Sequence, residues 1–190
     1  MNLARERIRA VRGGTIGEPP AALVHVVQYG DFECLDCGRA ATTLRSFRRR
    51  FAGAIRFSYQ HFPLDYVHPN ATQAAEAAEC ARAQGLFWKM HDLLMANQNR
   101  LALKRLYDYA EHAGLDMERF DTQMDAEEHL PTIHAHRASA MAHGVTRTPA
   151  FLIDGVLIDT SCGLRSLYEA TDVAISRQRP AWRIKSRTTS

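Results

Sequence analysis

The sequence has no long hydrophobic run and contains little cysteine. None of its apolar stretches approaches the roughly 20 residues that a membrane-spanning helix needs. The first residues, MNLARERIRAVRGG, carry charges where a secretory signal peptide needs an apolar core. We therefore expect a soluble, cytoplasmic protein without membrane insertion. In that compartment the 4 cysteines argue against a disulfide framework and favour reactive, metal-binding or buried thiols.

A strong charge of either sign is also missing, since the formal net charge is only +3. The excess of arginine gathers near the two ends of the chain, where such clusters are usually solvated tails. This pattern predicts no nucleic-acid partner. Internal repeats and low-complexity segments are absent too. A chain of 190 residues with 46% apolar composition suffices for one core and is short for two independent domains.

What the sequence does contain is an alternation of strand and helix patterns. Residues 1–20 close with GGTIGEPP and predict a flexible lead-in. LVHVVQY, residues 23–29, is apolar and rich in valine, which predicts a central strand. Residues 37–51 have helical periodicity, and IRFSYQHF, which begins at Ile55, alternates as a strand does.

The later part of the chain begins with a helical block. Residues 67–146 are alanine-rich with helical periodicity and predict several short helices, with Gly114 as a helix stop and Asp116 as the next cap. The segment PAFLIDGVLID then places Asp154 and Gly155 between two apolar runs, which predicts a β-hairpin. Residues 164–175 have the spacing of an amphipathic helix, and residues 179–190 are expected to form a basic tail.

The segment DFECLDCGRA, residues 31–40, places Cys34 and Cys37 where the predicted central strand meets a helix N-terminus. Backbone N–H groups and the helix dipole stabilise a thiolate on Cys34 there, and Cys37 lies close enough to form a disulfide. We interpret the pair as a redox dithiol in which Cys34 attacks and Cys37 resolves the mixed disulfide. Half of a zinc site and chance proximity remain alternatives. No second ligand pair has structural-site spacing, so we expect no metal.

Three motifs occur in the order VQYGDFECLDCG, FPLDYVHPNATQAAEAAECARAQGLFWKMHDLL and GVTRTPAFLIDG. Together they resemble the DsbA-like thioredoxin-fold family, especially its cytoplasmic bacterial members and the domains fused to sodium/proton antiporters. The resemblance covers about residues 23–174. It implies an α/β, thioredoxin-like fold with a central mixed sheet flanked by helices. Residues 21–66 and 147–178 would form this domain, and residues 67–146 an inserted helical subdomain.

The resemblance also implies an activity, that of a protein thiol-disulfide oxidoreductase or isomerase without a bound cofactor. Its partners would be protein thiols and disulfides, with a cellular dithiol or glutathione as the redox partner. Carried onto this sequence, Cys34 is the attacking cysteine, Cys37 the resolving one, and Thr148-Pro149 the cis-proline loop that faces them. A proline can take a cis bond at modest cost, so this loop can turn the backbone of Thr148 toward a peptide bound as an added strand.

The dipeptide between the cysteines, Leu35-Asp36, departs from the proline and the aromatic residue or histidine that are common in the family. At an assumed ~8 Å and an effective dielectric of ~20, Asp36 would oppose a Cys34 thiolate by roughly 2 kcal/mol. A helix N-terminus stabilises such an anion by about 0.3 to 1 kcal/mol, and by up to ~2 kcal/mol in favourable geometry. We expect these effects nearly to cancel, which would leave the couple more reducing than a strongly oxidising DsbA. Asp31 and Glu33 are expected to modulate the site as well, a buried one as proton acceptor for Cys37.

The remaining candidates have plainer interpretations. Cys80 is expected to be a small buried hydrophobe and Cys162 to be inert. His61 and His68 are expected to shape the junction between the two subdomains. The three histidines of HLPTIHAH are expected to be scattered on the surface; they are His129, His134 and His136.

Two alternative functions stay open. A kappa-like glutathione-dependent transferase or isomerase shares the expected architecture, but such sites use a serine or a lone thiol. The second alternative is a non-catalytic redox-sensing module that controls a partner.

Overall fold

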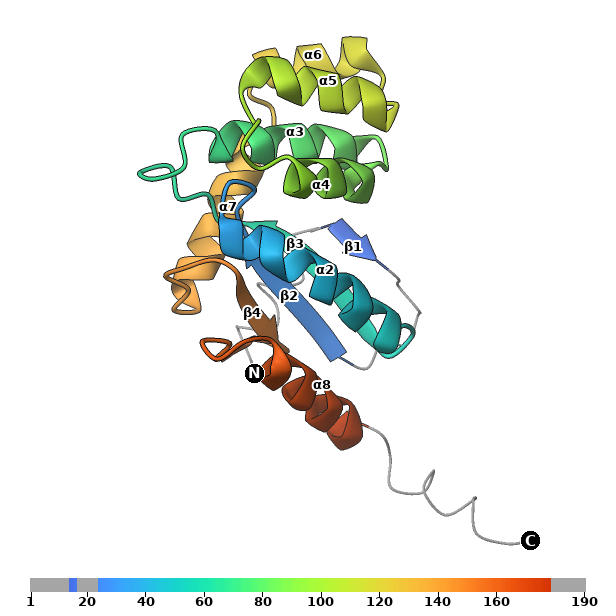
Figure 1. Cartoon of the computed structure of the whole chain (residues 1–190), viewed down its shortest axis with the longest axis vertical. Coiled ribbons are helices and arrows are strands. Elements are labelled where there is room, and N and C mark those ends of the chain that lie inside the picture. The colour runs from blue at the N-terminus through green and yellow to red at the C-terminus, as the bar shows by residue number, and fades with distance from the viewer. Residues whose placement is uncertain (1–13, 17–23, 179–190) are drawn as a thin grey trace, which may run out of the picture.

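The computed structural model describes residues 14–16 and 24–178 (Figure 1). Its centre is a five-stranded mixed sheet with the order β1-β3-β2-β4-β5. Strands β2 and β3 are parallel, and the other neighbours are antiparallel. The strands are Gly14–Ile16 (β1), Val24–Gly30 (β2), Ile55–His61 (β3), Ala150–Ile153 (β4) and Val156–Ile158 (β5). The expected central mixed sheet flanked by helices is therefore confirmed.

Strand β2 lies in the middle of the sheet, as its apolar run predicts. Every residue of the strand except His25 is buried. Val26 lies opposite Phe57 of β3 and Ile153 of β4, so its side chain joins the core on one face. Val27, the next residue, joins a separate core on the other face. A strand covered on both faces needs this nearly continuous apolar sequence.

The two faces of the sheet are covered by different helices. Helices α2 (Leu35–Arg50) and α8 (Arg165–Gln178) bury their apolar sides with the core that contains Val26. An edge-to-face contact joins the rings of Phe47 and Tyr168, whose centroids are 5.0 Å apart. Helix α7 (Leu130–Ala142) contributes Ala140 to the core that contains Val27.

The other helices form a layer of their own, stacked at one end of the molecule (Figure 1). They are α3 (Ala71–Ala83), α4 (Phe87–Ala96), α5 (Leu103–Ala113) and α6 (Met117–Asp125). Gly114 ends α5 in the left-handed region, with φ of 82°. The Asp116 side chain accepts a hydrogen bond from the Arg119 backbone N–H and caps α6. Both predicted helix boundaries are confirmed.

The predicted hairpin is confirmed, and its turn explains the residues there. Asp154 and Gly155 have φ values of 48° and 86°, and two positive φ angles are the requirement of a two-residue type I′ turn.

In the described ranges, no helix reaches the length and hydrophobicity that crossing a bilayer requires.

The segment expected to be a flexible lead-in contains a short strand that the sequence did not predict. Gly14–Ile16 pair with residues 57–59 of β3. The edge of β3 offers unpaired backbone groups, and this long-range pairing leaves no local signal in a segment rich in glycine and proline. The rest of the predicted lead-in and the predicted basic tail, residues 179–190, lie outside the described residues.

Candidate active site

The two cysteines of the CxxC segment lie where β2 passes into α2. Cys34 is the N-cap residue of α2, and its backbone carbonyl accepts the first bond of the helix from Gly38 N at 3.2 Å. Cys34 is 8% exposed, whereas Cys37 is 0% exposed. Both are free thiols. Of the two cysteines, only Cys34 is therefore accessible from the protein surface.

The surroundings of the two thiols shift their pKa values in opposite directions. The Cys37 thiol hydrogen-bonds to the Cys34 sulfur and is the main cause that lowers the pKa of Cys34 to about 6. Burial works against this shift, and Thr148 and the backbone N–H groups of Cys37 and Asp36 add to it. Burial raises the pKa of Cys37, and the neighbouring Cys34 raises it further. At neutral pH, Cys34 is a thiolate beside a protonated Cys37.

The expected cancellation of charge effects at Cys34 is wrong. The Asp36 carboxylate forms an ion pair with Arg39, whose Nε and Nη2 donate to Oδ1 at 3.1 and 2.5 Å. Both side chains are largely exposed, so Arg39 and solvent screen the charge of the carboxylate. The Asp36 backbone N–H meanwhile lowers the pKa of Cys34. The resulting value lies between the values of ~7 in thioredoxin and ~3.5 in DsbA.

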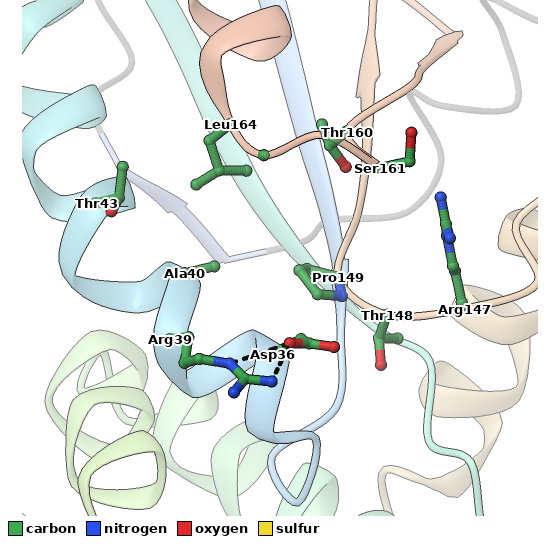
Figure 2. Close-up of a pocket in the computed structure, with 11 residues that line it drawn as sticks. Asp36, Arg39, Ala40, Thr43, Arg147, Thr148, Pro149, Thr160, Ser161 and Leu164 are labelled. Atoms are coloured by element: carbon green, nitrogen blue, oxygen red, sulfur yellow. Dashed lines mark hydrogen bonds and ion pairs between the residues drawn. The ribbon is translucent and has the colours of Figure 1, made fainter.

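Thr148 and Pro149 lie across from Cys34, although 114 positions separate Thr148 from it in the sequence. The Cys34 Sγ atom is 3.4 Å from the carbonyl oxygen of Thr148. The peptide bond between Thr148 and Pro149 is cis, and β4 begins at the next residue. Figure 2 shows this loop opposite the first turn of α2.

Asp31 and Glu33 join the turn before Cys34 to the loop between β3 and α3. The buried Asp31 carboxylate accepts hydrogen bonds from the backbone N–H groups of Glu33 and Leu64, at 2.8 and 2.9 Å. Its Oδ2 atom also lies 2.8 Å from Nδ1 of His68. The Glu33 carboxylate accepts from the backbone and the side chain of Asn70, at 2.6 and 2.8 Å. Both carboxylates therefore hold backbone in place beside the dithiol.

Gln98 is a site residue that the sequence analysis missed. Its Nε2 atom donates to the carbonyl oxygens of Phe32 and Cys34, at 2.9 and 2.7 Å. Gly38 makes room for it, since a Cβ atom at position 38 would lie 2.0 Å from Gln98 Oε1. A single glutamine between α4 and α5 carries no pattern that predicts this contact.

His136 corrects another expectation, because it is fully buried rather than on the surface. Its Nδ1 accepts a hydrogen bond from the backbone N–H of His61 at 3.3 Å, and burial lowers its pKa to about 3. The position of α7 on the sheet buries it, which the local sequence does not encode. His134 is exposed and His129 half-buried.

The two other cysteines lie outside the dithiol. Cys80 is fully buried, and burial raises its pKa to about 12, so its thiol is unreactive. Cys162 is exposed.

A buried polar cluster connects β3 to α3 and α7. His61, Glu79 and His136 have possible metal-ligand atoms within 4.8 Å of one another. The Glu79 carboxylate, however, accepts two hydrogen bonds from Arg82, at 2.7 and 2.9 Å, and also lies 2.5 Å from His61 Nε2. A guanidinium in contact with the carboxylate disfavours a cation there. The geometry fits a buried ion pair extended by neutral histidines.

Comparison with known proteins identifies a family and a fold that match this chain. A thioredoxin family model matches residues 10–172. The structure of a thioredoxin-like oxidoreductase from Silicibacter pomeroyi is similar, with a TM-score of 0.78 and 25% identity, covering 95% of this chain and all of that one. BdbD of Bacillus subtilis, in its oxidised form, has a TM-score of 0.77 at 18% identity, covering 86% of this chain and 93% of that one. The expected thioredoxin-like fold is confirmed.

Curated relatives are longer proteins. The Na(+)/H(+) antiporter NhaA 1 of Salinispora arenicola is 40% identical over 161 residues, which cover 85% of this chain and 24% of the antiporter. NhaA 3 of Salinispora tropica is 41% identical over 137 residues, which cover 72% of this chain and 21% of that protein. This chain therefore spans about a quarter of the length of the curated relatives it matches.

Proposed function

Because this chain belongs to the thioredoxin family, we propose that it is a DsbA-like thiol-disulfide oxidoreductase that exchanges disulfides with protein thiols. One observation carries the proposal: a thiol with a pKa of about 6 stands at the N-terminus of α2, next to a buried thiol whose pKa is raised. The thiolate is the nucleophile of exchange, and its partner thiol is kept protonated until it is needed.

In the reducing direction, the Cys34 thiolate attacks one sulfur of a substrate disulfide. The substrate S–S bond breaks, and the departing substrate sulfur takes up a proton. Cys37 then attacks the Cys34 sulfur, its own proton passes to the second substrate thiolate as that thiolate leaves, and the Cys34–Cys37 disulfide forms. The substrate gains two electrons from the dithiol, one proton from Cys37 and one proton from solvent. The reverse sequence oxidises a substrate dithiol, and attack followed by reattack within one substrate isomerises it.

Thr148 and Pro149 are proposed as the substrate-binding loop. The closeness of the Thr148 carbonyl oxygen to Cys34 Sγ, 3.4 Å, supports this role. A peptide that brings its sulfur to Cys34 passes the Thr148 backbone and can pair with it as an extra strand.

Asp31, Glu33 and Asp36 are proposed as modulators of the dithiol. Asp31 and Glu33 would act by positioning, because their oxygens are occupied by His68 and by backbone N–H groups of the neighbouring loop. Asp36 would act through its backbone N–H, since its carboxylate is paired with Arg39.

The cytoplasm is the proposed compartment, with glutathione or a cellular dithiol as redox partner and a couple more reducing than that of DsbA. Two observations support this. The pKa of Cys34, about 6, lies above the ~3.5 of DsbA, and a less stabilised thiolate goes with a more reducing couple. Cys162 is an exposed free thiol, and such a thiol persists best in a reducing compartment.

Reduction of a protein disulfide by the purified chain, with glutathione as electron donor, tests the function. We expect Cys34→Ser to abolish the activity, because the thiolate that attacks the substrate is removed. Cys37→Ser should accumulate a mixed disulfide between Cys34 and the substrate, visible by mass spectrometry. Cys162→Ser is the matched control and should behave as the parent protein. Full activity of the Cys34→Ser variant would refute the proposal.

A further inference from the structure

A groove opens on one side of the Thr148-Pro149 loop (Figure 2). It has a volume of about 380 Å³ and lies between the first turns of α2, this loop and the loop that joins β5 to α8. Arg39 lines it from α2, Arg147 precedes the loop, and Thr160 and Ser161 line the opposite wall. Thr148 belongs both to this groove and to the contact with Cys34, so the groove lies beside the reactive sulfur.

Among the described residues that line the groove, arginines outnumber acidic residues. Asp36 is the only acidic residue that lines it in the part of the chain that the structure describes, and its carboxylate is paired with Arg39. Arg147 is exposed, and within the described ranges no carboxylate lies within ion-pair distance of it. Figure 2 shows its side chain extending toward the loop of Ser161. The carboxylate of Asp159, which precedes that loop, accepts a hydrogen bond from the backbone N–H of Ser161 at 2.9 Å. This bond is the main cause that lowers the pKa of Asp159, and the charge of Arg147 adds to it from beyond ion-pair distance.

We propose, building on the exchange reaction proposed above, that this groove binds a carboxylate carried by a residue next to the reacting cysteine of a peptide substrate. Arg147 supplies a cation that forms no ion pair with a described carboxylate. Its guanidinium can donate two parallel hydrogen bonds to a carboxylate. The hydroxyls of Thr160 and Ser161 provide further donors on the facing wall. The groove thereby selects acidic over basic sequences around the reacting sulfur.

Short peptides with one cysteine, activated as the neutral 2-pyridyl disulfide, test this selectivity. The Cys34 thiolate attacks the peptide sulfur and releases 2-thiopyridone, whose absorbance gives the rate. Cys37 then displaces the peptide as a free thiol. The peptides carry a single Glu, Gln or Lys at each of the four positions flanking the cysteine. The rate for each peptide is divided by the rate at which dithiothreitol reacts with the same peptide. This ratio corrects for differences in the intrinsic reactivity of the peptides.

At low salt we expect one flanking position at which Glu reacts about threefold faster than Gln, and Lys more slowly, as for a partly exposed charge pair. High salt should reduce the preference, because it screens exposed charges. In Arg147→Gln the ratio of the Glu to the Gln rate should fall to about one, and Arg147→Glu should favour Lys. Arg119→Gln removes the same charge from α6, at the far end of the molecule, and should keep the preference (Figure 1).

Equal normalised rates for Glu, Gln and Lys at every position would overturn the inference, as would a preference that survives Arg147→Gln. Neither result contradicts the proposed function; in this assay that function fails if the parent protein reacts with every peptide no faster than Cys34→Ser does. Oxidised glutathione, a small disulfide with several carboxylates, serves as a further arm. A loss of rate in Arg147→Gln with the peptides but not with glutathione identifies a polypeptide as the source of the carboxylate.

Discussion

At the scale of single residues, the reactivity of Cys34 depends on hydrogen-bond donors gathered around its sulfur. The Cys37 thiol contributes most, and the first backbone N–H groups of α2 add to it. The same arrangement makes Cys37 a poor acid, because its thiol is buried and its proton is shared with a thiolate. The proposed order, attack by Cys34 and resolution by Cys37, follows from this asymmetry.

The first prediction concerns the pH dependence of Cys34. Its pKa is lowered to about 6, so the thiolate fraction should rise steeply through that pH and level off above pH 7. We expect the alkylation rate of Cys34 by iodoacetamide, followed by mass spectrometry of the reduced protein, to rise about tenfold between pH 5 and pH 7. Cys162, followed in the same samples, is the internal comparison. A midpoint near that of a free cysteine, about 8.5, would contradict the account.

The second prediction concerns Gln98. Its removal in Gln98→Ala leaves the carbonyl oxygens of Phe32 and Cys34 without their donor. We expect the free energy of unfolding to fall by about 1 to 2 kcal/mol, measured by urea denaturation of the reduced protein. Asn99→Ala changes the exposed neighbour and should have almost no effect. Equal losses in the two variants would show that the contact contributes nothing.

Residues at this site differ in how far the sequence reveals them. The spacing of Cys34 and Cys37 and the strand before them predict that the pair lies at the start of a helix, because neighbouring residues determine where a helix begins. The pairing of Asp36 with Arg39 was missed, although the two are one helical turn apart and within reach of each other. Gln98 lies 64 positions from Cys34, and only the packing of the helical layer on α2 brings them together.

At the scale of elements, the buried cluster around Glu79 fastens α3 to the sheet. Glu79 on α3 bonds His61 at the end of β3, while Arg82 keeps the carboxylate paired. Both partners together lower the pKa of Glu79 well below its usual range, although burial opposes the shift. Removing the charge on Glu79 would leave the half-buried Arg82 guanidinium without its counterion.

The third prediction follows for Glu79→Gln. We expect a loss of about 3 kcal/mol in the free energy of unfolding at pH 7, since one partner of a buried ion pair is removed. The pKa of Glu79 is depressed in the folded protein, so its stabilisation is present above its unfolded value of about 4.5 and is lost as the pH falls. The difference between parent and variant should therefore shrink below pH 4. Glu169→Gln, an exposed position on α8, is the control. Equal stability of Glu79→Gln and this control at pH 7 would refute the prediction.

Elements with local signals were predicted well. The cap at Asp116, the stop at Gly114 and the turn at Asp154 and Gly155 depend on the chemistry of a few consecutive residues. Strand β1 was missed because its pairing comes from the free edge of β3, far along the chain. The burial of His136 likewise depends on where α7 lies, and a histidine on a helix does not reveal its face when the helix has no clear apolar side.

At the scale of the whole molecule, separate parts of the chain meet at the dithiol. The end of β2 and the start of α2 supply the two cysteines, the loop after β3 binds Asp31 and Glu33, and Gln98 reaches in from the helical layer. The Thr148-Pro149 loop closes the site from the opposite side. We propose that residues 67–146 form an inserted subdomain. In this arrangement the end of β2 and the start of α2 hold the cysteines, and the inserted segment contacts the site through Gln98.

The central claim is that Cys34 and Cys37 form a reversible redox couple. The most direct measurement is an equilibrium titration against glutathione, followed by thiol trapping and mass spectrometry of each cysteine. We predict a single two-electron transition confined to this pair, near or below the cytosolic glutathione poise of about −220 mV. A midpoint near that of DsbA, about −120 mV, would contradict the proposed reducing couple. If no poise produced a disulfide between Cys34 and Cys37, the dithiol mechanism itself would be wrong.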